Sequence, residues 1–111
     1  SRGLGDVYKR QEHHSTLSFE SDIRLDLSAK VLYVSEQPVP LTKSEYSICE
    51  YLAKNRGQVF TKEQIYEAVF GFDGIGDNST ISTHIKNIRA KLEHFKISPI
   101  STVWGIGYKW E

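Results

Sequence analysis

The chain has 111 residues, of which 39% are hydrophobic and 25% charged, and its formal net charge is zero. This length suits one domain with a real core, and the composition argues against wholesale disorder. The sequence has no run of about 18 apolar residues that would span a membrane, and its start lacks the apolar stretch of a secretory signal. The single cysteine, Cys49, excludes an internal disulfide and is expected in the core, with the cytoplasm as the natural compartment.

The N-terminal segment is expected to lie outside the fold. The chain contains no methionine, so we interpret it as a fragment, a processed chain or a recombinant product. Residues 1–11 show no clear hydrophobic period and include two glycines. We therefore expect residues 1–15 to be a linker or a non-native segment, and residues 16–111 to form the domain.

Short alternating stretches follow between residues 17 and 40. The segments 17–20, 23–27 and 30–34 each place apolar side chains at nearly every second position, and turn-like Ser-Asp and Ser-Ala pairs separate them. A fourth short strand ends near Pro40. This alternation predicts a small antiparallel sheet of four strands.

The next segment has the period of a helix. Thr42 and Glu45 have the spacing of a capping box, in which the threonine hydroxyl accepts from the amide of the glutamate and the glutamate reaches back. The predicted helix stops at Gly57. Its inward-facing stripe comprises Tyr46, Ile48, Cys49, Leu52 and Ala53.

A second capping box, Thr61 with Gln64, predicts a second helix that ends at Gly71. One short strand, Val59-Phe60, is expected just before it. Asn78 or Ser79 is expected to cap a third helix.

The third helix has one apolar and one polar face. Ile81, Ile85, Ile88 and Leu92 recur at steps of four, three and four, which places them on one helical face. The side chains pointing elsewhere are of the types that read base edges or hold phosphates: Ser82, Thr83, Lys86, Asn87 and Arg89. A helix with these two faces is suited to the major groove of DNA.

Residues 100–104 and 108–110 read as strands joined at 105–107, a hairpin. The second helix, its loop and the third helix are the parts of a helix-turn-helix, and the terminal hairpin is a wing. The expected fold class is therefore α+β: a winged helix-turn-helix with an N-terminal antiparallel four-stranded sheet, three helices and a C-terminal β-hairpin wing.

The charge is unevenly distributed. Residues 79–111 carry five bases against two acids, whereas residues 12–40 carry five acids against two bases. Phosphate attraction depends on this local field, which is screened beyond about 8–10 Å at ordinary salt. The C-terminal third can therefore face DNA although the whole chain is neutral.

Several motifs together resemble one known family. They are Leu41-Thr-x-x-Glu45-Tyr46, Gly57-x-Val-Phe-Thr-Lys-Glu-Gln-Ile65, Val69-Phe-Gly71, Thr80-Ile-x-x-His84-Ile-x-x-Ile-Arg89-x-Lys-Leu92 and Thr102-Val-x-Gly-x-Gly-Tyr-Lys109. In this order and spacing the chain resembles the OmpR/PhoB-type winged-helix effector domains of two-component response regulators, over about residues 16–111.

The resemblance implies a function and partners. Such domains bind double-stranded DNA and control transcription, with the third helix (here about 79–93) in the major groove and the hairpin 100–110 as the wing at the minor groove or backbone. They follow a receiver domain, which is phosphorylated in a phosphorelay that starts at a sensor kinase and which promotes homodimerisation on directly repeated half-sites. The loop between helices two and three can touch RNA polymerase, and the corresponding residues here are Phe72, Asp73, Ile75 and Asp77.

The resemblance also assigns DNA-binding positions. Lys86, Asn87 and Arg89 fall where relatives place groove-facing and phosphate-holding side chains, and Thr80 and His84 fall near the DNA backbone. The full expected set is Ser79, Thr80, Ser82, Thr83, His84, Lys86, Asn87, Arg89 and Lys91 on the helix, with Thr102, Trp104, Gly105, Gly107 and Tyr108 on the wing.

Three positions depart from the family pattern. Many relatives have arginine where this chain has Ser79, Asn87 and Trp104. An asparagine suits bidentate contact with adenine better than with guanine. Trp104 cannot pair with phosphate through charge, and its ring is expected to pack either at the sugar edge or in the hinge of the wing.

Other functions have weaker support. A winged helix that binds only proteins is the alternative, favoured by the neutral total charge and by the aromatic Trp104 and Trp110. An enzyme is not expected, because the sequence shows no phosphate loop, nucleophile motif or metal cluster, and Glu45 and Glu63 are explained as a cap and a helix-start charge. No cofactor and no metal are expected, and His84 has no partner at a metal-ligand spacing.

Overall fold

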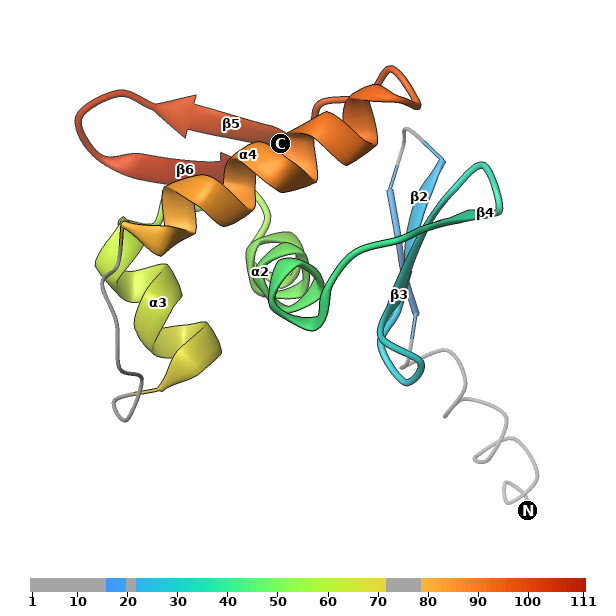
Figure 1. Cartoon of the computed structure of the whole chain (residues 1–111), viewed down its shortest axis with the longest axis horizontal. Helices are drawn as coiled ribbons and strands as arrows, with labels where there is room; N and C mark the ends of the chain where they lie inside the picture. Colours follow the sequence, from blue (N-terminus) through green and yellow to red (C-terminus); the bar gives the residue numbers. More distant parts are fainter. Residues whose placement is uncertain (1–15, 20–21, 72–78) are drawn as a thin grey trace, which may run out of the picture. The chain divides into compact units, whose positions relative to one another are not determined.

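The computed structural model describes residues 16–19, 22–71 and 79–111. The chain divides into two compact units, residues 1–39 and 40–111, and each is described by itself. The first unit is a four-stranded antiparallel sheet with the strand order β1-β2-β3-β4 (Figure 1). Its strands are β1 (Thr16–Ser18), β2 (Ile23–Asp26), β3 (Val31–Val34) and β4 (Gln37–Val39). The four-stranded sheet expected from the alternating sequence is confirmed.

The two-residue alternation separates buried from partly exposed side chains in β2 and β3. Arg24 and Tyr33 are cross-strand partners, and the Arg24 guanidinium lies 4.2 Å from the centre of the Tyr33 ring. Arg24 also forms an ion pair with Glu36 at 2.9 Å, which raises the pKa of the guanidinium. The buried side chains of the strands are Ile23, Leu25, Leu32, Val34 and Val39.

The second unit holds three helices and a hairpin (Figure 1). Its elements are α2 (Lys43–Lys54), α3 (Lys62–Phe70), α4 (Thr80–Glu93), β5 (Ile100–Val103) and β6 (Gly107–Trp110). β5 and β6 pair antiparallel, with Ile100 opposite Trp110 and Val103 opposite Gly107. Three helices followed by this hairpin are the expected parts of a winged helix-turn-helix.

The core of the second unit is built from one face of each helix. The predicted stripe of α2 and the isoleucine-leucine stripe of α4 are both buried, and Ile65 of α3 and Trp110 of β6 join them. Cys49 is buried in this core as expected, and burial raises the pKa of its thiol, so it stays protonated. Burial of these apolar surfaces is the main favourable contribution to the stability of the unit.

Both predicted capping boxes are present. The Thr42 hydroxyl accepts from the Glu45 backbone N–H at 3.1 Å, and the Glu45 carboxylate accepts from the Thr42 backbone N–H at 2.9 Å. Thr61 and Gln64 make the same two bonds at 3.1 and 2.8 Å. Each box satisfies backbone donors that a helix start leaves without a partner in the helix.

The helix ends differ in part from expectation. Gly71 ends α3 at φ +78° as predicted, whereas α2 ends at Lys54, before Gly57, which adopts φ +88° after the helix. At the start of α4, Ser79 occupies the cap position in a helical conformation and its side chain makes no capping hydrogen bond. Of the two predicted caps, Ser79 thus holds the cap position without a capping bond, and Asn78 lies outside the described residues.

The predicted strand at Val59-Phe60 is reduced to a single bridge. Phe60 pairs antiparallel with Tyr108, through two backbone hydrogen bonds of 2.9 Å. Gly107 lies so close to this point that an added Cβ would come within 1.9 Å of the Phe60 carbonyl oxygen. Gly107 was expected in the turn, but it is the first residue of β6. It is needed for close backbone approach, whereas Gly105 supplies the positive φ of +83° in the turn.

Candidate nucleic-acid interface

The exposed face of α4 lies opposite its buried stripe. The buried side chains are Ile81, Ile85, Ile88 and Leu92, and the exposed residues are Ser79 at the cap and Thr80, Thr83, Lys86, Asn87, Ala90 and Glu93. This order follows from the helical period, because residues three or four apart share a face. In the part of the chain that the structure describes, Lys86 has no carboxylate within ion-pair distance. From Ser79 to Ala90 the exposed face therefore presents hydroxyls, an amide and the cation of Lys86, and Glu93 adds a carboxylate at the end of the helix.

One flank of α4 is fixed to the hairpin by Arg89. Its guanidinium donates to the Thr102 hydroxyl at 2.7 Å and to the Ile100 carbonyl at 3.1 Å, and it lies 5.6 Å from the centre of the Tyr108 ring. The Tyr108 hydroxyl donates to Ser82 Oγ at 3.5 Å, a long bond. The structure thus brings together four of the expected DNA contacts, and their contacts join α4 to the wing.

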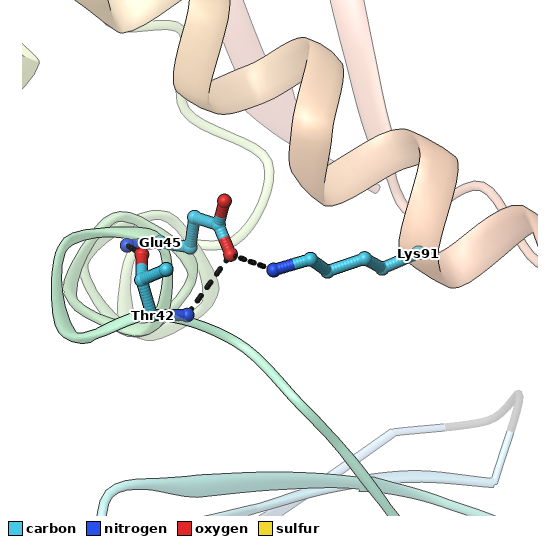
Figure 2. Close-up of polar contacts among 3 residues, drawn as sticks. All are labelled: Thr42, Glu45 and Lys91. Atoms are coloured by element: carbon cyan, nitrogen blue, oxygen red, sulfur yellow. Dashed lines mark hydrogen bonds and ion pairs between the residues drawn. The ribbon is translucent and has the colours of Figure 1, made fainter.

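The other flank of α4 contacts α2 and α3. The His84 ring stacks on Phe70 of α3, with their centroids 6.0 Å apart. Lys91 forms an ion pair with Glu45 of α2, with Nζ 2.5 Å from Oε1 (Figure 2). The positive charge of Lys91 is therefore balanced inside the protein, which the sequence did not indicate.

Glu45 is the single buried charged residue among those described, with 3% of its surface exposed. Burial alone would raise its pKa. The hydrogen bonds from Lys91 and from the Thr42 backbone N–H, with the positive charge of Lys91, outweigh burial and leave the pKa of Glu45 below its ordinary value. The carboxylate is thus held ionised. Its capping role was predicted, but no sequence signal pointed to a partner 46 residues away.

The wing ends in two exposed apolar side chains. Trp104 is 89% exposed and Ile106 is 57% exposed, and both belong to the turn between β5 and β6. Ile106 was not among the expected site residues, although its place in the glycine-flanked turn is a signal that it is exposed. An open groove of about 580 Å³ lies between the start of α3 and this hairpin, and it is lined by residues 61–63 and 102–108.

Some expectations fall outside what the structure describes. Phe72, Asp73, Ile75 and Asp77 belong to a segment that is not described, so their proposed contact with RNA polymerase stays a prediction. Within the described ranges, no cluster of three or more His, Cys, Asp or Glu side chains could hold a metal ion. No helix there has the length and apolar character needed to cross a membrane.

The elements and their order define a winged helix-turn-helix protein. A family model described as "Transcriptional regulatory protein, C terminal" matches residues 36–110. The chain therefore belongs to this family of transcriptional output domains, of the OmpR/PhoB type found in response regulators. The family, the fold class and the function expected from the sequence, DNA binding in transcription regulation, are confirmed.

Individual relatives agree with this assignment. The chain is 40% identical over 103 residues to the transcriptional regulatory protein SpaR of Bacillus subtilis, covering 93% of this chain and 47% of SpaR. It is 38% identical over 107 residues to the response regulator SaeR of Staphylococcus aureus, covering 92% of this chain and 46% of SaeR. The chain thus spans about half the length of these curated relatives.

Solved structures show the same fold. The response regulator DrrB of Thermotoga maritima, described as an OmpR/PhoB homolog, superposes with a TM-score of 0.75 at 27% identity, over 96% of this chain and 50% of DrrB. The DNA-binding domain of CpxR from E. coli gives a TM-score of 0.72 at 28% identity, over 86% of this chain and 94% of that domain.

Proposed function

We propose that the domain reads double-stranded DNA by placing the exposed face of α4 in the major groove. The observation that carries this proposal is the separation of the two faces of α4: the apolar stripe is buried, while Thr83, Lys86 and Asn87 are exposed. A major groove admits one α-helix, and its base edges are read by side chains of these types. Ser79 and Thr80 lie at the exposed N-terminal end of the helix, where contacts to the DNA backbone are expected.

Asn87 and Lys86 have different roles in this proposal. Asn87 reads a base, with a preference for adenine, because its side-chain N–H can donate to adenine N7 while its Oδ1 accepts from the adenine N6 amino group. Lys86 holds a phosphate and adds affinity without sequence preference. The two residues are adjacent and both exposed, so each is a matched control for the other.

The test is a selection of random duplex DNA on the 111-residue chain at two salt concentrations. We expect enrichment of a repeated motif of about six base pairs that is rich in A·T where Asn87 lies. Asn87→Ala changes the base preference, whereas Lys86→Ala weakens binding to all sequences and reduces the slope of log affinity against log salt by about one. Absence of enrichment from a folded domain would favour the alternative, a module that binds only proteins.

We assign the wing tip an apolar contact with the DNA. Trp104 and Ile106 are exposed and uncharged, so a contact with the sugar edges of the minor groove would release no counterions. We expect Trp104→Ala to lower DNA affinity about three- to tenfold at every salt concentration, with the salt slope unchanged and the stability within about 0.5 kcal/mol. A change in slope without a loss of affinity at high salt would contradict this role.

For the whole protein we propose the arrangement that its relatives suggest. The chain spans 47% of SpaR and 46% of SaeR. A receiver domain would precede it, a sensor kinase would act on that receiver, and two copies would bind directly repeated half-sites as a homodimer. Residues 71–78 would contact RNA polymerase. We also propose that the protein acts in the cytoplasm, where its DNA ligand lies, and that it has no catalytic activity of its own.

A further inference from the structure

Two kinds of contact hold α4 in the second unit. The first is the buried apolar stripe, which is a non-directional contact: it favours burial but tolerates small rotations and shifts of the helix. The second is a set of directional contacts on the two flanks, which includes those from Arg89 to the hairpin and from Lys91 to α2. Directional contacts with fixed partners define the rotation and the axial position of a helix more narrowly than apolar packing does.

The position of the Glu45 carboxylate is set within the start of α2, independently of Lys91. One oxygen, Oε1, accepts both from the Thr42 backbone N–H at 2.9 Å and from Lys91 Nζ (Figure 2). The carboxylate therefore belongs to the helix start of α2, and the capping box holds it there independently of α4. Only 4% of the Glu45 side chain and 31% of the Lys91 side chain are exposed, so water competes little for the carboxylate end of the pair.

We infer that Glu45 is a positioning residue for DNA recognition, and that Lys91 acts through Glu45 and not by holding a DNA phosphate. The ion pair fixes the last turn of α4 against the first turn of α2 and thereby sets where Lys86 and Asn87 lie in the groove. This inference rests on the proposed major-groove binding by α4. It revises the expectation that Lys91 is a DNA contact.

The test compares two lysines of the same helix, one paired and one exposed. Lys91→Met and the matched control Lys86→Met are measured against the selected half-site and against a random duplex, across a range of salt concentrations. For Lys91→Met we expect the ratio of specific to random affinity to fall about tenfold with an unchanged salt slope, because base contacts are misplaced while no phosphate contact is lost. For Lys86→Met we expect equal losses on both duplexes and a slope reduced by about one.

Two further variants separate positioning from folding. Lys91→Met leaves the Glu45 carboxylate buried without its cation, so the double variant Glu45→Gln/Lys91→Met, which removes both charges, is measured as well. It should fold, as judged by circular dichroism at the assay temperature, and still show the reduced ratio. Lys91→Arg keeps a cation that can reach Glu45, and it should restore the ratio to within about twofold.

The outcomes distinguish this inference from the proposed function. If Lys91→Met behaves as Lys86→Met does, Lys91 holds a phosphate and the inference is wrong. If the folded double variant keeps the wild-type ratio, Glu45 has no positioning role and the inference is equally wrong. If the wild-type chain enriches no motif, the proposed function fails first, and the inference fails with it.

Discussion

The two capping boxes have the same local design in different surroundings. Thr42 with Glu45 and Thr61 with Gln64 have the same spacing, and their four hydrogen bonds all fall between 2.8 and 3.1 Å. Glu45 is buried and also binds Lys91 of α4, whereas Gln64 is exposed. The comparison teaches that a box sets where a helix begins, while the surroundings of its third residue decide whether that helix start is coupled to another helix.

The largest expected difference in stability between the two boxes appears when the third residue of each box is replaced by alanine. Glu45→Ala should lower the free energy of unfolding by about 2–3 kcal/mol, because it removes the box and leaves the half-buried Lys91 without its partner. Gln64→Ala should cost about 1 kcal/mol or less, since water replaces the lost bond at an exposed site. Urea unfolding followed by circular dichroism measures both, and equal losses would show that the Lys91 contact adds nothing.

Removing the threonines should make the two boxes alike again. Thr42→Ala and Thr61→Ala each delete the hydroxyl that accepts from the third helical amide, and both bonds measure 3.1 Å. We expect a loss of about 1 kcal/mol in each case, by the same unfolding measurement. A difference of more than about 0.5 kcal/mol between them would mean that the hydroxyls, and not only the third residues, are coupled to their surroundings.

Local signals in the sequence were enough to predict most of the fold. The two-residue alternation of the strands, the stripe of α4 and both boxes depend only on neighbours a few residues apart, and all are found. One misplaced feature depends on residues far away in the sequence. Gly107 looked like a turn residue, but it is required by the Phe60 carbonyl, 47 residues earlier in the sequence.

The candidate site likewise has a part that local sequence signals predict and a part that depends on long-range contacts. The exposed face of α4 follows from the helical period, so Lys86 and Asn87 could be placed from the sequence. The sequence could not show that Arg89 binds the hairpin or that Lys91 binds Glu45, because a basic side chain at such a position is equally compatible with a phosphate and with a carboxylate of the protein. Long-range pairing alone decides between the two.

The smallest expected difference between the boxes is their response to acid. The pKa of Glu45 is below its ordinary value, so in the folded state this group binds its proton only at lower pH than in the unfolded chain. Its contribution to stability is therefore present above the ordinary carboxyl value, about 4.5, and is lost as the pH falls through the lower value of the folded state. Gln64 does not titrate, so the second box makes no such contribution.

Glu45→Gln should accordingly flatten the fall in stability between about pH 5 and pH 3, relative to the wild-type chain. Glu67→Gln, which removes an exposed carboxylate of α3, is the matched control and should leave the pH profile close to that of the wild type. The measurement is the urea midpoint at a series of pH values. If the Glu45→Gln profile runs parallel to that of the wild type, the Lys91 and Thr42 contacts do not favour the ionised carboxylate, and the first box is no different from the second in its electrostatics.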